Sequence, residues 1–280
     1  MTSPAIQGTA LHPAWPLPLF LLRTAWADQP YDALTEYVGG LAQAHLLEVV
    51  GDRVAMLDGV SPAAGPAGVL PGLVAALRRA GGSGTGSAEA GGPFPAPEVL
   101  SLLTAAPGDS ASLPPVPAVR TDVAAAGCGV LVRDPVVGQA VCLTVRVVDG
   151  EVARWRARGV ADCPVAPQPD GPAAALADLG RAVVEAAELI ERSTAGGGTT
   201  GVVDVHGHVT RLPAGLTPRV LELVDRVDRV EAIVALALAL PGVGADPAGR
   251  EPVLRRLVSA LDAARRAAVA AAGAEALRAH

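Results

Sequence analysis

Apolar and polar residues alternate between residues 123 and 157, whereas beyond residue 172 the apolar residues recur every three to four positions. A period of two is typical of strands with one buried face, and a period of 3.6 is typical of amphipathic helices. We therefore predict strands at 123–132, 140–148 and 151–157, the last two joined by a tight turn at Asp149-Gly150. Helices are predicted at 172–193, 217–240 and 251–278.

A second hairpin, at 202–212, would bring the sheet to about five strands. The order of strands and helices predicts an α+β fold in which an antiparallel sheet is covered by helices. Before it, helices at 17–27, 31–44 and 69–80 and a β-hairpin over 46–57 predict a smaller, mainly helical N-terminal unit. Gly, Pro, Ser and Ala dominate residues 81–118, which predicts a linker with a short helix at 97–106. The predicted domains are 1–80 and 119–280, with the linker 81–118 between them.

Composition restricts both the core and the classes of partner. Aromatic residues make up 2% of the chain, so the core must be built from small aliphatic side chains. The net charge of −6 opposes sequence-independent binding of nucleic acid, which needs clustered positive charge. The longest apolar run, at 232–240, is too short to cross a bilayer. Cys128, Cys142 and Cys163 match neither a disulfide framework nor a zinc pattern, which favours a reduced, cytoplasmic protein.

The chain contains one candidate metal cluster: Asp204, His206 and His208 alternate along one segment. On a continuous strand their side chains would share a face and hold one divalent metal ion. If His206-Gly207 instead forms the turn of the 202–212 hairpin, the two histidines point in different directions and bind no metal. Both interpretations are open from the residues alone.

The string that contains this cluster, residues 201–209, resembles the His-x-His first strand of the amidohydrolase superfamily, where two histidines on a barrel strand bind metal. The resemblance implies a metal-dependent hydrolase. It covers about ten residues, and a barrel of that kind takes some 200 residues. Because 72 residues follow His208, we do not expect that barrel.

Two helices and a hairpin in residues 17–57 resemble a winged-helix module, which would read DNA through the helix at 31–44. That helix carries Asp32 and Glu36 and no arginine. Residues 17–60 hold Arg23 and Arg53 against six acidic residues, so phosphate would be repelled. A module of this kind is therefore expected to contact protein.

Other candidates have structural alternatives. His45 is either a lone acid–base group or a core histidine near the end of the 31–44 helix. Cys128 lies between two glycines and is either a reactive thiol or a small buried side chain. The arginines of the last helix would dock an acidic partner or form a solvated face; they are Arg250, Arg255, Arg256, Arg265 and Arg266. The triglycine 196–198 lacks the strand–loop–helix order and the lysine of a phosphate loop.

The chain thus shows no paired nucleophile and base, no nucleotide loop and no dominant basic face. We predict a non-enzymatic protein-binding module of the adaptor or dedicated chaperone type, without a cofactor. Its partner is another protein rather than nucleic acid or a membrane, and the apolar stripes of the last two helices also suit a homodimer. The alternatives are a metal-dependent hydrolase that uses Asp204, His206 and His208 with one divalent metal ion, and a winged-helix transcriptional regulator.

Overall fold

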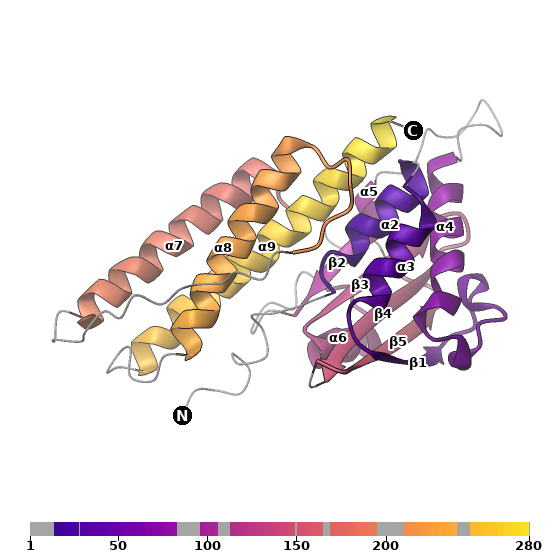
Figure 1. Cartoon of the computed structure of the whole chain (residues 1–280), viewed down its shortest axis with the longest axis horizontal. Helices are drawn as coiled ribbons and strands as arrows, with labels where there is room; N and C mark the ends of the chain where they lie inside the picture. The colour runs from indigo at the N-terminus through magenta and orange to yellow at the C-terminus, as the bar shows by residue number, and fades with distance from the viewer. Residues whose placement is uncertain are drawn as a thin grey trace.

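The structure, a computed structural model, describes residues 14–27, 29–82, 96–105, 113–148, 150–164, 169–194, 210–239 and 247–279. One sheet packs against helices, most of which lie on the same side of it (Figure 1). The α-helices are α2 (Leu17–Trp26), α3 (Tyr31–Gly39), α4 (Leu70–Gly82), α5 (Ala96–Val99), α6 (Pro117–Ala126), α7 (Pro172–Thr194), α8 (Pro218–Ala239) and α9 (Pro247–Ala279). The strands are β1 (Ala44–Gly51), β2 (Leu100–Thr104), β3 (Cys128–Asp134), β4 (Gln139–Val148) and β5 (Val152–Val160), and the 3-10 helices are η1 (Ala55–Leu57), η2 (Pro62–Ala64) and η3 (Pro66–Gly68).

The sheet is open and mixed, with the strand order β1-β5-β4-β3-β2. β1 runs parallel to β5, and the other three pairs are antiparallel. The predicted α+β fold with about five strands is confirmed, as is the hairpin turn between β4 and β5, where Gly150 has a φ of 73°. The sheet joins β1 from residues 1–80, β2 from residues 81–118 and three strands from residues 119–280.

The hairpin predicted over 46–57 is wrong. Residues 44–51 form the single strand β1, which pairs along its whole length with β5, and residues 55–57 form η1. At the end of β1, Gly51 has a φ of 86° and the amide of Asp52 donates a hydrogen bond of 2.9 Å to the carbonyl of Gly159. The Gly-Asp pair therefore fastens the end of β1 to β5 instead of reversing the chain.

Two further elements differ from their predictions. The strand predicted at 123–132 begins at Cys128, because Pro117 starts α6 and Gly127, with a φ of 83°, ends it. The helix predicted at 97–106 is the single turn α5 followed by β2, which pairs with β3. Of the hairpin predicted at 202–212, residues 210–212 are not in a strand and the others lie outside the described residues.

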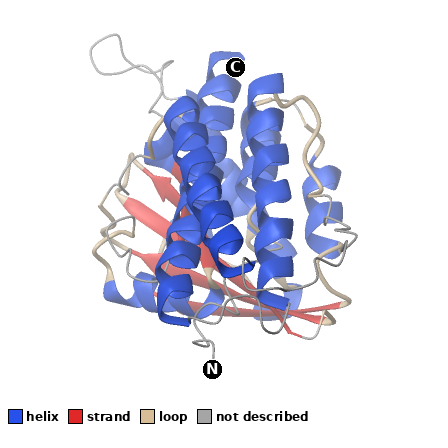
Figure 2. Cartoon of the chain, turned by 90° about the vertical axis from the view of Figure 1, so that its left-hand side faces the viewer, coloured by secondary structure: helices blue, strands red, loops and turns tan. Residues whose placement is uncertain are grey.

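Most of the helices form two groups, and α6 lies apart from both on the opposite face of the sheet. α2, α4 and α9 pack against the face of the sheet that carries Leu143 and Trp155, which we call the first face, and α3 packs on α2. α7 and α8 lie along α9, and Figure 1 shows these three long helices side by side, extending beyond the sheet. In Figure 2 the long helices stand on one side of the strands. Because α9 contacts α7, α8, α2 and β2, it connects the three-helix group to the sheet.

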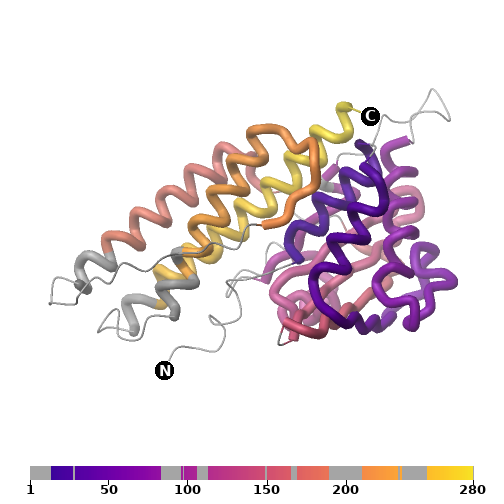
Figure 3. The backbone as a smooth tube through the Cα atoms, viewed as in Figure 1, coloured from indigo at the N-terminus to yellow at the C-terminus, as the bar shows by residue number. Residues whose placement is uncertain are grey.

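The main core fills the space between the first face of the sheet and these helices. Its largest fully buried side chains include Trp26 of α2 and Trp155 of β5. The indole of Trp26 donates a hydrogen bond of 2.8 Å to the carbonyl of Leu77 in α4, so its polar atom is satisfied inside the core. In Figure 3 the indigo tube of α2 and the yellow tube of α9, from opposite ends of the sequence, lie next to each other, and the two helices are in contact. The core therefore depends on contacts between distant parts of the chain.

We expect Gly159→Ala to lower the free energy of unfolding by about 1 to 3 kcal/mol, measured by urea denaturation. A Cβ at this position of β5 would lie 2.1 Å from the carbonyl oxygen of Asp52, so the backbone that fastens β1 to β5 must shift. Gly180→Ala in α7 is the control, because nothing lies within 4 Å of the added atom. There alanine should stabilise the helix by about 0.5 to 1 kcal/mol. Equal stability of the two variants would contradict this account of the β1–β5 junction.

Candidate functional site

The second face of the sheet is partly covered. Over β2, β3 and β4 it packs against α6 and forms a small separate core, whose members are Leu103, Leu113, Val119, Val123, Leu131, Ala140, Cys142, Val160 and Cys163. Toward β5 and β1 the side chains of the same face become charged or exposed, as expected where α6 no longer covers them. This uncovered part of the second face is the candidate site.

The pairing registers place its residues in rows that cross β4, β5 and β1. The outer row is Arg146, Arg154 and Leu46; the middle row is Thr144, Arg156 and Glu48; the inner row is Cys142, Arg158 and Val50. Residues two apart on a strand share a face, so β5 supplies an arginine to every row. We call the outer row together with Glu48 and Arg156 the open face.

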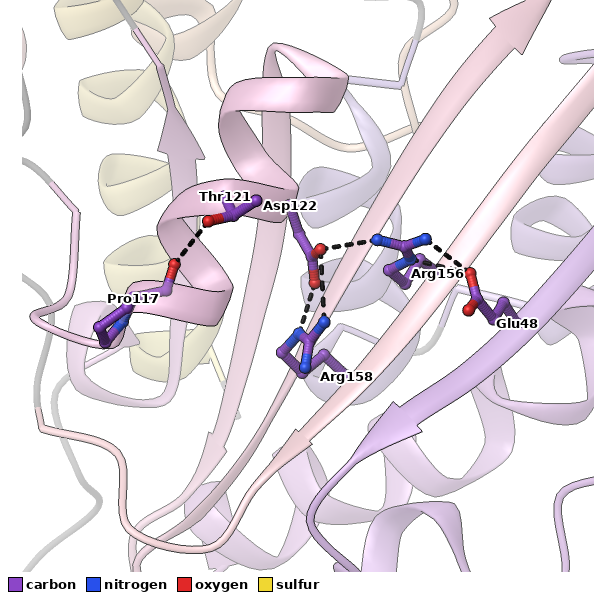
Figure 4. A network of polar contacts seen from close by, with 6 residues as sticks. All are labelled: Glu48, Pro117, Thr121, Asp122, Arg156 and Arg158. Atoms are coloured by element: carbon purple, nitrogen blue, oxygen red, sulfur yellow. Dashed lines mark hydrogen bonds and ion pairs between the residues drawn. The ribbon is translucent and has the colours of Figure 1, made fainter.

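Asp122 of α6 neutralises the arginines nearest the covered part of the sheet (Figure 4). Its carboxylate accepts hydrogen bonds from Arg156 Nη1 at 2.9 Å and from Arg158 Nε at 2.5 Å. Arg156 also reaches Glu48 on β1, with 2.8 Å between Nη2 and Oε2. Burial raises the pKa of Asp122, but the hydrogen bonds and charges of Arg158 and Arg156 outweigh it and hold the pKa below its ordinary value. Asp122 therefore stays ionised and fixes α6 to β5.

The outer row has no such acidic partner among the described residues. Arg146 and Arg154 stand directly opposite each other on neighbouring strands, and both are exposed. Neither forms an ion pair with a residue that the structure describes. Like charges in this position repel each other, which disfavours the pair. Leu46, beside Arg154 on β1, is 57% exposed. The outer row thus presents two positive charges that no described carboxylate pairs with, next to an exposed apolar side chain.

A second polar cluster is buried between α8 and α9. Arg265 Nη2 lies 2.6 Å from Glu231 Oε1, and its Nη1 lies 3.2 Å from Asp262 Oδ1. The side chains of Arg265 and Asp262 are each 1% exposed. The guanidinium carbon also lies 5.9 Å from the centre of the Trp15 ring, within range of a cation–π contact. Two carboxylates therefore share this buried guanidinium, with Arg266 alongside.

The electrostatics of this cluster follow from its burial. Burial raises the pKa of Asp262 to about 6, although Arg265 and Arg266 act in the opposite direction. Burial also raises the pKa of Asp228 on α8, whose carboxylate accepts a hydrogen bond of 2.7 Å from the Thr210 hydroxyl. Asp262 Oδ2 and Arg265 Nε have no hydrogen-bond partner among the described residues. Attraction between opposite charges therefore stabilises this cluster, although not all of its polar atoms form hydrogen bonds.

The predicted metal ligands Asp204, His206 and His208 lie outside the described residues, as does the triglycine 196–198. Within the part of the chain that the structure describes, no three His, Cys, Asp or Glu side chains are placed to hold a metal ion. The metal site and the hydrolase that it implies stay a prediction. Analysis of the purified protein for a stoichiometric divalent metal, with and without His206→Ala, tests them directly.

His45 lies on β1 rather than near the end of a helix, and its hydrogen bonds fix its tautomer. The indole of Trp155, which can only donate, gives a hydrogen bond of 2.9 Å to His45 Nδ1. Nδ1 is therefore the unprotonated nitrogen, and Nε2 donates to the carbonyl of Ala42 at 3.1 Å. Both ring nitrogens are occupied within the protein, which supports the structural reading of this residue.

Cys128 is buried at the start of β3, and burial raises the pKa of its thiol to about 12. A nucleophilic cysteine needs a thiolate near neutral pH, so this one is a small buried side chain and not a reactive thiol. Cys142 and Cys163 are also buried, burial raises the pKa of each, and all three cysteines are free.

The structure also bears on two other candidates from the sequence, the winged-helix module and the arginines of α9. The resemblance of residues 17–57 to a winged helix fails, because its wing would be the hairpin that is replaced by β1 and η1. On α9, Arg255 pairs with Glu251 and Arg256 pairs with Glu185 of α7, so these arginines are engaged within the protein. The side chain of Arg250 is not described.

Comparisons with protein-family models, with curated proteins and with solved structures found no match. In the described residues, no helix has the length and apolar character needed to cross a membrane. The open face was missed by sequence reasoning, although one signal for it was present: Arg154, Arg156 and Arg158 occupy alternate positions of one strand and must share a face.

Proposed function

We propose that this chain is a non-enzymatic protein-binding module of the adaptor or dedicated chaperone type, and that it contacts its partner through the open face. The observation that carries the proposal is the outer row, where Leu46 is exposed beside Arg154 and Arg146. Arginine is enriched at protein interfaces, and an exposed leucine beside it adds apolar area whose burial by a partner is favourable. Folding within this chain leaves that part of the sheet uncovered, and binding of another protein would bury it.

Two features of the surroundings support the proposal. The open face lies on regular strands, and Asp122 ties it to α6, so its geometry is fixed before binding. The three free, buried cysteines fit the cytoplasmic location that we propose for the protein. A second copy of the chain is one partner that this proposal admits.

Site-specific photo-cross-linking tests the proposal in the organism that encodes the chain. A benzophenone amino acid at position 46 should cross-link a defined polypeptide, identified by mass spectrometry and then reconstituted with the purified chain. Position 184 on α7 is the matched control, because Val184 is 56% exposed and Leu46 is 57% exposed. Cross-linking at neither position, or equally at both, would count against a binding site on the open face. Cross-linking to a second copy would identify the homodimer, which sedimentation velocity would verify.

A further inference from the structure

We infer that the partner of the open face is an acidic polypeptide segment with an apolar side chain beside its carboxylates. This inference rests on the proposed function and names the chemistry of the partner. It starts from the charges of the open face and its neighbours, where Arg156 and Arg158 are satisfied by Asp122 and Glu48 (Figure 4). Arg146 and Arg154 are left with positive charge that no described carboxylate balances.

The spacing of the outer row describes the complementary ligand. Arg146 and Arg154 are opposite each other on antiparallel strands, so their Cβ atoms are about 5 Å apart. Leu46 continues the row at the next strand, again about 5 Å away. A guanidinium donates two parallel hydrogen bonds to a carboxylate, so two neighbouring carboxylates fit the two arginines. An apolar side chain next to them would cover Leu46.

Charge and composition favour a polypeptide over nucleic acid. Nucleic-acid binding depends on many phosphate contacts along a basic track, but this row offers two uncompensated arginines. Binding to a phosphate backbone would not bury the apolar side chain of Leu46, whereas an apolar side chain of a peptide can bury it. The exposed leucine therefore separates the two classes of ligand.

The chain itself offers no suitable occupant among its segments outside the described residues. Each of these segments contains at most one acidic residue, and residues 1–13 and 165–168 contain none. A pair of arginines that repel each other gains most from a ligand with two or more carboxylates. The partner is accordingly expected to be a separate polypeptide rich in Asp and Glu.

Fluorescence anisotropy with a labelled peptide, Gly-Glu-Glu-Leu-Glu-Glu-Gly, tests the inference on the full chain. We expect saturable binding that weakens with added salt. Arg146→Gln with Arg154→Gln should weaken it at least tenfold. The control is Arg181→Gln with Arg229→Gln, two arginines that are each 67% exposed on α7 and α8, which change the net charge equally and should stay within twofold. Leu46→Ser should weaken binding of this peptide severalfold but not of a peptide with Ser in place of Leu.

The possible outcomes separate the inference from the function on which it rests. Binding that is insensitive to Arg146 and Arg154, or preference for an oligothymidine of twenty nucleotides over the peptide, would overturn the acidic-polypeptide inference. If position 46 cross-links a partner without an acidic segment, the protein-binding function stands and the inference fails. If neither a cross-linked partner nor peptide binding is found, both are wrong.

Discussion

Replacing Arg265 with leucine is expected to lower the free energy of unfolding by about 3 to 5 kcal/mol, because it leaves Glu231 and Asp262 buried without their shared cation. Stabilities of folded domains are typically about 5 to 15 kcal/mol, so the loss would remove a large part of the total. Chemical denaturation of the variant and the wild type at pH 7 measures the difference. Arg255→Leu is the control, since that arginine is 48% exposed and pairs with Glu251 on the same helix, a pair worth about 0.5 kcal/mol.

A triple variant distinguishes lost charge balance from lost packing. Arg265→Leu combined with Glu231→Leu and Asp262→Leu removes all three charges, and replacing a buried ionic cluster by apolar side chains is often neutral or stabilising. We expect the triple variant to regain most of the stability that the single variant loses. If it is as unstable as the single variant, the cluster acts through its shape and the electrostatic explanation is wrong.

Asp262→Asn is expected to remove a pH dependence from the stability of the protein. The pKa of Asp262 in the folded state is about 6, above its ordinary value of 3.8. Because the pKa is higher in the folded state than in the unfolded state, the protonated carboxyl contributes to the stability of the fold. This contribution is complete below pH 3.8 and is lost as the pH rises through 6. A shift of this size corresponds to a loss on the order of 3 kcal/mol. The asparagine variant cannot ionise. Its free energy of unfolding, relative to that of the wild type, should therefore rise by that amount between pH 4 and pH 7.

Urea denaturation at several pH values between 4 and 7.5 measures this difference. The other charged groups around Asp262 are Arg265 and Arg266 on α9 and Glu231 on α8, and all of them are kept in the variant. Asp178→Asn on α7 is the control, because that side chain is 44% exposed and should leave the pH dependence as in the wild type. Parallel curves for Asp262→Asn and the wild type would show that the buried carboxyl does not titrate in this range.

The long helices and the β4–β5 hairpin could be predicted from the sequence, whereas several short elements and the long-range pairings could not. β4, β5 and their turn depend on alternation and on Gly150, which are short-range signals. The parallel pairing of β1 with β5 joins His45 to Ala153, about 108 residues apart, and no local pattern encodes it. β2 was hidden because its five residues stand in a stretch whose composition indicates a linker. Such a strand is specified by the sheet edge that receives it.

For the candidate site, too, the local features could be predicted from the sequence and the long-range contacts could not. The arginines of β5 could be placed on one face from their spacing alone. That Asp122 compensates Arg156 and Arg158 but not Arg154 depends on where α6 packs, which the sequence does not state. Arg265 resembled the exposed arginines of α9 in sequence, and its burial follows from its position against α8 and Trp15. Sequence patterns therefore identify faces, whereas tertiary packing decides which charges on them stay free.

The contact between α2 and α9 has a consequence for synthesis of the protein. Nine of the ten residues of α2 are buried, and α9 supplies part of the surface that covers them. About 220 residues separate Trp26 from Pro247, and a ribosome that adds 5 to 20 residues per second takes roughly 10 to 45 s to translate them. During that interval the apolar side chains of α2 lack the part of their cover that α9 supplies, which favours aggregation of the nascent chain until α9 emerges.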